Sequence, residues 1–251
     1  MTRLKHIFLY SMCSCVVFAQ SPYIDKVYDF NPAPGQFVNV IPQYEEGDTY
    51  DAMIQKANLA IANNARSMIC LGGFGGSITF GFDHDIVNHS GEYDFQVFGN
   101  AMLSTNAADG RVGGSSEPGI IYVSADDNGN GLPDDKWYEI AGSEYYKPET
   151  KHNFTITYYR TPKSHQPTPS VVNKLLVDTT FILWKDSDGK VGYISKNSYH
   201  TQNYFPEWVD ADSISFTGTL LADNALWNNT SNMYILYCYD YGYADNYPNQ
   251  Y

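Results

Sequence analysis

A ten-residue stretch, from Asp126 to Asp135, restricts the possible folds of this chain more than any other segment. Its sequence, Asp-Asp-Asn-Gly-Asn-Gly-Leu-Pro-Asp-Asp, places oxygen-bearing side chains at alternating positions and a glycine, Gly131, at the sixth. This pattern is the first half of the D-x-[DN]-x-[DN]-G loop, whose oxygens surround a calcium ion. Because its acids repel one another without a counter-ion, we predict a Ca²⁺ site here. The predicted ligands are Asp126, Asn128, Asn130, Leu132, Asp134 and Asp135.

The residues on either side of this loop are typical of β-strands. Segments 119–124 and 136–140 are rich in β-branched and aromatic residues. The twelfth loop position, where a helical EF-hand carries Glu, is Trp137. We therefore expect a strand–loop–strand calcium site and not an EF-hand. A polar hairpin turn that binds no metal is the alternative interpretation.

The first nineteen residues have the features of a signal peptide. A short basic start precedes the apolar run 7–18, which is too short to span a membrane, and Ala19 is a small residue before the expected cleavage point. We expect an exported protein, at the cell surface, in the periplasm or outside the cell. A lipid anchor at Cys15 is the alternative, although it shortens the apolar run. We expect no transmembrane segment in the rest of the chain.

The charge of the chain restricts its partners. The formal net charge is −13, and loss of residues 1–19 removes two basic residues, Arg3 and Lys5, and no acids, which gives −15. A chain this acidic repels nucleic acid and anionic lipid. The 22 tyrosines supply flat amphipathic rings that suit sugars and other ring-shaped ligands.

The apolar pattern predicts a mainly β protein with a single helix. An amphipathic helix is expected at 49–65, capped by Asp48 or Thr49. Many short strands at regular spacing favour a β-sandwich or jelly roll, in a single domain that covers 20–251. The expected strands are 68–71, 77–82, 93–98, 119–124, 136–140, 153–159, 180–185, 191–195, 213–220 and 233–239.

Two short features add detail to this fold. The glycines of 72–76 lack the following Lys-Ser/Thr and helix of a phosphate loop, so we expect a bulge or a close approach of two backbones. Asp186 to Lys190 is expected to form a hairpin turn. Cys70 and Cys238 are the cysteines that remain after cleavage, and a disulfide and two free thiols are both compatible with the sequence.

Several segments in a fixed order resemble one protein family. They are Leu71–Gly76, Gly81–His84, Asp94–Asn100, Ser116–Ser124, the acidic loop, Trp137–Ile140 and Gly142–Tyr145. As a set, across residues 28–247, they are similar to exported cell-surface proteins of Gram-negative gut anaerobes, often described as PKD-domain-associated.

The resemblance implies a jelly-roll domain similar to galactose-binding-like modules, and an association with outer-membrane uptake of nutrients, including corrinoids. It transfers no catalytic residue to this chain. Family members continue beyond the segment that corresponds to Tyr241–Asn246, so we expect that this chain lacks the last strands of the sandwich.

If consecutive strands run antiparallel, the turns alternate between the two ends of the sandwich. Asp83, His84 and the calcium loop then share one end, where the metal has a structural role. The long Gly- and Ser-rich loop 99–118 lies at the other end, which we expect to be the recognition face. The predicted ligand-binding residues of that face are Asn100, Glu117, Tyr145 and Tyr146.

These observations favour a non-catalytic, calcium-stabilised binding module at the cell surface. Its ligand is expected to be a glycan or a small nutrient such as a corrinoid, and outer-membrane uptake proteins are candidate partners. A secreted glycosidase with paired carboxylates is the first alternative. A structural or adhesive surface domain is the second. The sequence contains no G-x-S-x-G, H-E-x-x-H or Cys–His signature, so we expect no enzyme of those classes.

Overall fold

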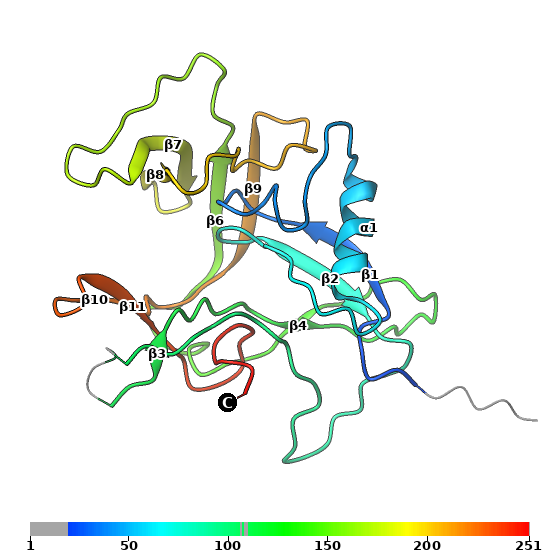
Figure 1. Cartoon of the computed structure of the whole chain (residues 1–251). Helices are drawn as coiled ribbons and strands as arrows, with labels where there is room; N and C mark the ends of the chain where they lie inside the picture. The colour runs from blue at the N-terminus through cyan, green and yellow to red at the C-terminus, as the bar shows by residue number, and fades with distance from the viewer. Residues whose placement is uncertain (1–19, 106, 108–109, 251) are drawn as a thin grey trace, which may run out of the picture.

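The computed structural model describes residues 20–250 except for 106, 108 and 109 (Figure 1). The expected signal peptide and Cys15 lie outside the described residues. The chain is mainly β, in several antiparallel sheets with little helix, which is consistent with a β-sandwich. The elements are β1 (Lys26–Asn31), α1 (Tyr50–Ile61), β2 (Ser77–Gly81), β3 (Gly113–Gly114), β4 (Tyr122–Val123), β5 (Tyr138–Glu139), β6 (Lys151–Tyr159), β7 (Leu176–Asp186), β8 (Val191–Asn197), β9 (Ser213–Leu220), β10 (Ala225–Asn228) and β11 (Met233–Tyr237).

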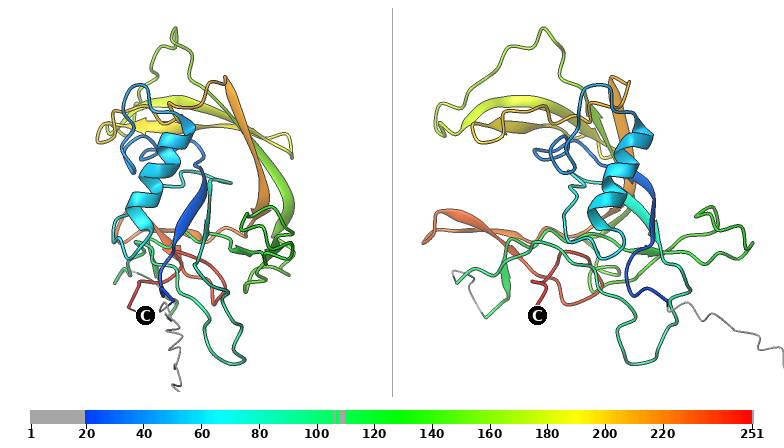
Figure 2. Two further views of the ribbon diagram at one scale, coloured as in Figure 1. Left: turned by 90° about the vertical axis from the view of Figure 1, so that its right-hand side faces the viewer. Right: turned by 45° about the vertical axis from the view of Figure 1, so that its right-hand side comes forward.

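The largest sheet has the strand order β8-β7-β6-β9, and it curves over the top of the molecule in Figure 2. Smaller sheets are β1-β2, β10-β11-β3 and β4-β5. The main core lies against the large sheet, where buried aromatic residues bury most apolar area. Its buried residues are Ala33, Tyr158, Ile182, Tyr204, Phe205 and Phe216.

A second core forms between α1 and β1. Thr49 caps the helix, since its hydroxyl accepts a hydrogen bond from the backbone N–H of Ala52 at 3.2 Å. One turn apart on the inner face, Met53 and Ala57 pack against side chains of β1 and are fully buried. Trp208 joins this core, with its ring centroid 6.2 Å from that of Phe30.

The glycine-rich segment 72–76 makes the close backbone approach that its sequence predicts. A Cβ at Gly72 would lie 1.7 Å from the carbonyl oxygen of Ala33, and its φ of 73° favours glycine. A Cβ at Gly76 would lie 1.7 Å from the carbonyl oxygen of Leu71. Without side chains, this segment packs directly on the backbone at Ala33, whose N–H donates to the Leu71 oxygen at 2.9 Å.

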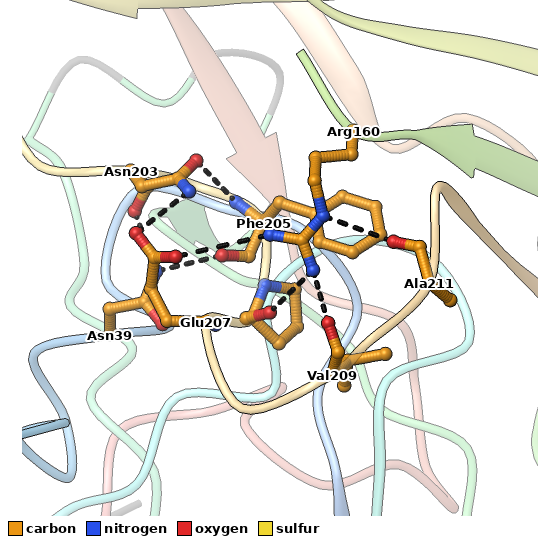
Figure 3. A network of polar contacts seen from close by, with 8 residues as sticks. Asn39, Arg160, Asn203, Phe205, Glu207, Val209 and Ala211 are labelled. Atoms are coloured by element: carbon orange, nitrogen blue, oxygen red, sulfur yellow. Dashed lines mark hydrogen bonds and ion pairs between the residues drawn. The ribbon is translucent and has the colours of Figure 1, made fainter. Parts of the chain in front are cut away.

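A polar network fixes the loop between β8 and β9 to the end of β6 (Figure 3). The guanidinium of Arg160 donates to the carbonyl oxygens of Ala211, at 3.0 Å, and Val209, and lies 4.2 Å from the centre of the Phe205 ring. On the other side of the loop, the amide of Asn39 donates to the Phe205 oxygen at 2.9 Å and accepts from the Glu207 N–H at 3.0 Å. These contacts satisfy backbone groups that have no strand partner.

Several expectations about the strands are wrong. Segments 68–71 and 93–98 are not strands, and β1 and β10 form where none was predicted. The expected strands 119–124 and 136–140 do pair antiparallel, as β4 with β5, but the expected strand 77–82 forms β2 and pairs with β1. Tyr93–Phe98 alternates like a strand but pairs with no strand in the described part of the chain; instead, the Gln96 amide donates to the backbone oxygen of Asn249 at 3.3 Å.

The two cysteines within the described part of the chain do not form a disulfide. Cys70 and Cys238 are both free thiols of intermediate exposure. Burial raises the pKa of each thiol above its ordinary value, so both are poor nucleophiles.

The substitution Met53→Ala should lower the free energy of unfolding by about 2–5 kcal/mol, because it removes a fully buried side chain between α1 and β1. Leu59 lies on the outer face of α1 and is 77% exposed, so Leu59→Ala should change the free energy of unfolding by less than about 0.5 kcal/mol. Urea denaturation measures both. Equal effects would show that α1 does not pack on β1 through Met53.

Candidate functional site

The acidic loop lies between β4 and β5 and is organised by its own side chains. Asp126 accepts hydrogen bonds from the N–H groups of Asn130 at 3.0 Å and Gly131 at 2.9 Å. Asn128 Oδ1 also accepts from the Asn130 N–H at 3.0 Å, and Asn130 Oδ1 accepts from the Leu132 N–H at 2.8 Å. These bonds turn the backbone around the side chains at positions 126, 128 and 130.

Asp134 closes this arrangement from the other end of the loop. The amides of Asn128 and Asn130 donate to its carboxylate at 3.1 Å and 3.0 Å. The next residue, Asp135, has one carboxylate oxygen, Oδ2, that is buried and has no hydrogen-bond partner among the described residues. A buried oxygen of this kind costs free energy unless a donor or a cation reaches it.

The donor set suits a hard cation such as Ca²⁺, which prefers oxygen ligands. Four predicted side-chain ligands, those of residues 126, 128, 130 and 134, are joined by the hydrogen bonds above. Within residues 20–250, apart from the three undescribed positions, no three His, Cys, Asp or Glu side chains cluster as a metal site. Calcium binding here would therefore also need the amide oxygens and a backbone carbonyl such as that of Leu132.

The loop is attached to its surroundings at two points. The hydroxyl of Tyr28, in β1, donates to the Gly131 carbonyl oxygen at 3.2 Å. The indole N–H of Trp137 donates to the Pro133 oxygen at 3.3 Å. The hydrogen bond of Tyr28 therefore connects the acidic loop to the β1-β2 sheet.

Asp83 and His84 form a local pair, as expected for structural residues. Their side chains approach to 2.6 Å, and Asp83 also accepts from the Ser21 N–H at 3.1 Å. The hydrogen bond to His84 is the largest cause that lowers the pKa of Asp83 below its ordinary value. The carboxylate thus holds the start of the described chain against the end of β2.

Two of the predicted ligand-binding residues, Asn100 and Glu117, meet at Asp245. The backbone N–H groups of Asn100 and Ala101 donate to Asp245 Oδ1 at 2.7 Å and 2.8 Å. The N–H of Glu117 donates to the Asp245 carbonyl oxygen at 3.2 Å. Asp245 is therefore the residue that joins the two loops, and sequence reasoning missed it because nothing local distinguishes it from the other acids.

The other two, Tyr145 and Tyr146, form an aromatic pair whose ring centroids are 4.8 Å apart. Tyr145 also packs on His152, with centroids 4.6 Å apart. Tyr146 is 87% exposed. The pair is positioned by the same C-terminal segment, since the Ser143 N–H donates to the Tyr241 oxygen at 3.1 Å.

The four predicted residues thus form two groups, Asn100 with Glu117 and Tyr145 with Tyr146. The segment 239–246 makes hydrogen bonds next to each group. A pocket of about 620 Å³ lies next to the first group, between 99–103 and 248–250. Asn100 lines this pocket, whereas Glu117, Tyr145 and Tyr146 do not. The four predicted residues therefore do not share one cavity.

Two carboxyl groups of this region, those of Asp245 and Glu117, have pKa values raised above their ordinary values. Burial raises the pKa of Asp245, and the N–H groups of Ala101 and Asn100 only partly oppose this effect. Glu117 is exposed as a residue, yet desolvation by the surrounding chain raises its pKa, and the negative charge of Asp245 raises it further. Among the described residues, no cation contributes to the pKa of either acid and offsets the loss of water.

Comparison with known proteins finds no matching family model and no matching curated protein. Within the described part of the chain, no helix has the length and apolar character needed to cross a membrane.

The substitution Asp245→Asn should make the stability of the protein less dependent on pH. Because burial raises the pKa of Asp245 above its ordinary value of 3.8, its contribution to stability is complete below that pH and is lost as the pH rises through the higher folded pKa. Asn keeps an acceptor for the two N–H groups but cannot ionise. Relative to the wild type, the variant should therefore gain stability between about pH 3 and about pH 7.

Urea denaturation at the two pH values measures this difference. Asp127→Asn removes the same charge from an exposed loop and reports the effect of net charge alone. If the free energy of unfolding of Asp245→Asn differs from that of the wild type by the same amount at both pH values, Asp245 does not bind its proton more tightly in the folded protein.

Proposed function

We propose that this chain is an exported, calcium-stabilised binding module of the cell surface that performs no chemistry on its ligand. The observation that carries the proposal is the acidic loop, where Asp126, Asn128, Asn130 and Asp134 are joined by hydrogen bonds and Asp135 has a buried oxygen without a partner. Calcium would replace the hydrogen bonds to Asp134 and fix the loop between β4 and β5. The metal has a structural role, because the predicted ligand-binding residues lie on other loops.

Calcium should raise the melting temperature of the protein. At a concentration a hundred times Kd, calcium adds about 2.7 kcal/mol to the stability, which corresponds to about 5–10 °C for a domain of this size. Asp126→Asn should remove most of this increase, because it exchanges a charged ligand for a neutral one. Differential scanning calorimetry with calcium and with a chelator measures the shift.

Asp127→Asn is the matched control, because it removes one charge from the same loop at a position between the alternating ligands. It should keep the calcium-dependent increase. A melting temperature that is the same with calcium and with chelator would contradict the metal site.

The recognition face in this proposal combines the 99–103 pocket with the exposed pair Tyr145 and Tyr146. Flat aromatic rings beside loop amides are suited to sugars and to ring-shaped nutrients such as corrinoids. A jelly-roll arrangement and a partnership with outer-membrane uptake proteins remain part of the proposal, on the basis of the resemblance described above. A glycan and cobalamin binding screen tests the ligand class.

Tyr146→Ala should weaken binding of the ligand found in this screen about tenfold or more, because an exposed aromatic ring is the usual anchor of such a face. The substitution should leave stability unchanged, since Tyr146 is 87% exposed. Tyr93→Ala removes a tyrosine that is 98% exposed on another loop and should bind as the wild type does. Isothermal titration calorimetry measures the three affinities, and equal values would remove the tyrosine pair from the site.

A glycosidase is the second candidate function, and one observation favours it. Glu117 and Asp245 are neighbouring acids with raised pKa values, as a general acid in a glycosidase has. Against this role, Asp245 Oδ1 is occupied by the N–H groups of Asn100 and Ala101. Release of sugar in the glycan screen, abolished by Glu117→Gln, would establish the enzyme in place of the binding module.

A surface domain that binds another protein is the third candidate. The β10-β11 hairpin extends on the side opposite the acidic loop (Figures 1 and 2) and exposes Leu226, Trp227, Met233 and Tyr234. Exposed apolar side chains that lie together favour protein contact. A failed ligand screen together with capture of a defined surface partner by this hairpin would favour this function.

A further inference from the structure

A second pocket, of about 410 Å³, lies at the opposite end of the molecule from the recognition face. It forms where the segment 160–175, which rises above β7 and β8 in Figure 1, returns to the large sheet. Its volume is in the range of small-molecule sites. None of its lining residues belongs to the acidic loop or to the segment 239–246.

A buried carboxylate forms one wall of this pocket. Asp178 is 2% exposed, and its Oδ1 accepts from the N–H groups of Thr168 at 3.1 Å and Thr180 at 3.0 Å. Its Oδ2 lies 2.7 Å from Nε2 of His165. Burial opposes ionisation of Asp178, but these hydrogen bonds outweigh it and the pKa is lowered.

His165 is therefore oriented by a charged group. Because Asp178 is ionised, the nitrogen that faces it, Nε2, carries the proton. In the neutral ring, Nδ1 is then an acceptor, and no described residue forms a hydrogen bond with it. Its side chain is 20% exposed, so a ligand in the pocket can reach the ring.

Lys196 supplies a positive charge on the adjacent strand. It is the register partner of Asp178 across β7 and β8, so the two side chains lie on the same face of the sheet. Its ammonium lies 4.4 Å from the centre of the Phe181 ring and makes no ion pair or hydrogen bond with a described residue. Burial lowers the pKa of Lys196, and Asp178 offsets this only in part.

The groups that remain available define the ligand. The oxygens of Asp178 are occupied, so the pocket presents the ammonium of Lys196, the acceptor of His165 and an apolar wall of Phe181, Pro162 and Pro167. An ammonium suits a carboxylate, the imidazole nitrogen suits a hydroxyl group, and the ring wall suits the C–H face of a sugar. Sugar acids carry all three features.

We propose that this pocket binds a uronic acid, either free or as a residue of a glycan. Lys196 pairs with the carboxylate of the sugar, His165 accepts a hydrogen bond from a ring hydroxyl, and the apolar wall with Pro162 and Pro167 packs against the ring. Because Asp178 makes its hydrogen bonds to Thr168, Thr180 and His165, the Lys196 ammonium is the group that can pair with an anion in this pocket. The site does not depend on calcium or on the 99–103 pocket.

Titration of the chain with sodium glucuronate, glucose and benzoate tests the proposal. Glucose keeps the ring and hydroxyls without the carboxylate, and benzoate keeps a carboxylate and a ring without hydroxyls. Glucuronate should bind at least about tenfold more tightly than either compound. It alone can form both the charged hydrogen bond to Lys196 and the neutral hydrogen bond to His165. Glucose binding equal to that of glucuronate would exclude the role of Lys196, and benzoate binding as tightly would exclude the sugar.

Two variants connect this binding to the pocket. Lys196→Met keeps the apolar stem of the side chain and should weaken glucuronate at least about tenfold, without weakening glucose. Lys185→Met is the matched control, because Lys185 also lies over an aromatic ring, that of Tyr159 at 5.3 Å, but does not line the pocket. Equal glucuronate affinity in the wild type and in Lys196→Met would overturn the proposal.

If Lys196→Met does not fold, the wild-type titration is followed by the NMR signals of the His165 ring. Glucuronate should shift these signals, and glucose at the same concentration should shift them at least about tenfold less. Binding of glucuronate without any change at His165 would place it elsewhere and overturn the proposal. A calcium titration with no effect would reject the metal site while leaving this result intact, so the two proposals fail separately.

Discussion

The hydrogen bonds between Asn246 and Tyr239 hold together the part of the molecule in which the strands are shortest. The buried amide of Asn246 donates to the Tyr239 carbonyl oxygen and accepts from the Tyr239 N–H, both at 2.7 Å, and so acts as a strand partner would. Here β3, β4 and β5 have two residues each, so ladders satisfy few backbone groups. A buried group without a partner destabilises a fold more than one hydrogen bond stabilises it. Asn246, and Asp245 beside it, therefore supply donors and acceptors that the short strands do not provide.

The sites of this molecule therefore differ in whether loops or paired strands hold their side chains in place. The proposed recognition face and the acidic loop are organised by polar side chains of loops, and their order depends on hydrogen bonds that water can replace. The pocket of His165, by contrast, has Asp178 and Lys196 on adjacent strands of the large sheet, directly above the main core. Side chains on paired strands are placed more rigidly than side chains on loops. A calcium ion would give the acidic loop the rigidity that its two-residue flanking strands do not provide.

Local signals in the sequence predict structure well wherever the partner of a segment is close in the chain. The expected strand 191–195 lies within β8, and the turn at Asp186 to Lys190 joins it to its partner β7. The alternation of Tyr93–Phe98 is just as regular, but no strand lies beside it, and alternation alone cannot show this. The same holds for the sites. The oxygens of the acidic loop lie within ten residues, whereas Asp245 meets Asn100 across 145 residues, and Lys196 meets the pocket only through the register of β7 and β8. No pattern in a single sequence predicts these long-range contacts.

The acids of this chain fall into two groups that differ in how their charge is compensated. Asp48, Asp83 and Asp178 have lowered pKa values because hydrogen bonds to each carboxylate are already in place, so a ligand would gain little by approaching them. Asp245 and Glu117 have raised pKa values, since burial removes water that no cation replaces. A ligand that brings hydroxyl donors or a cation to these two acids would relieve that cost, and its binding would raise their ionised fraction. The two groups of acids therefore differ in whether the described chain compensates the loss of water around each carboxylate.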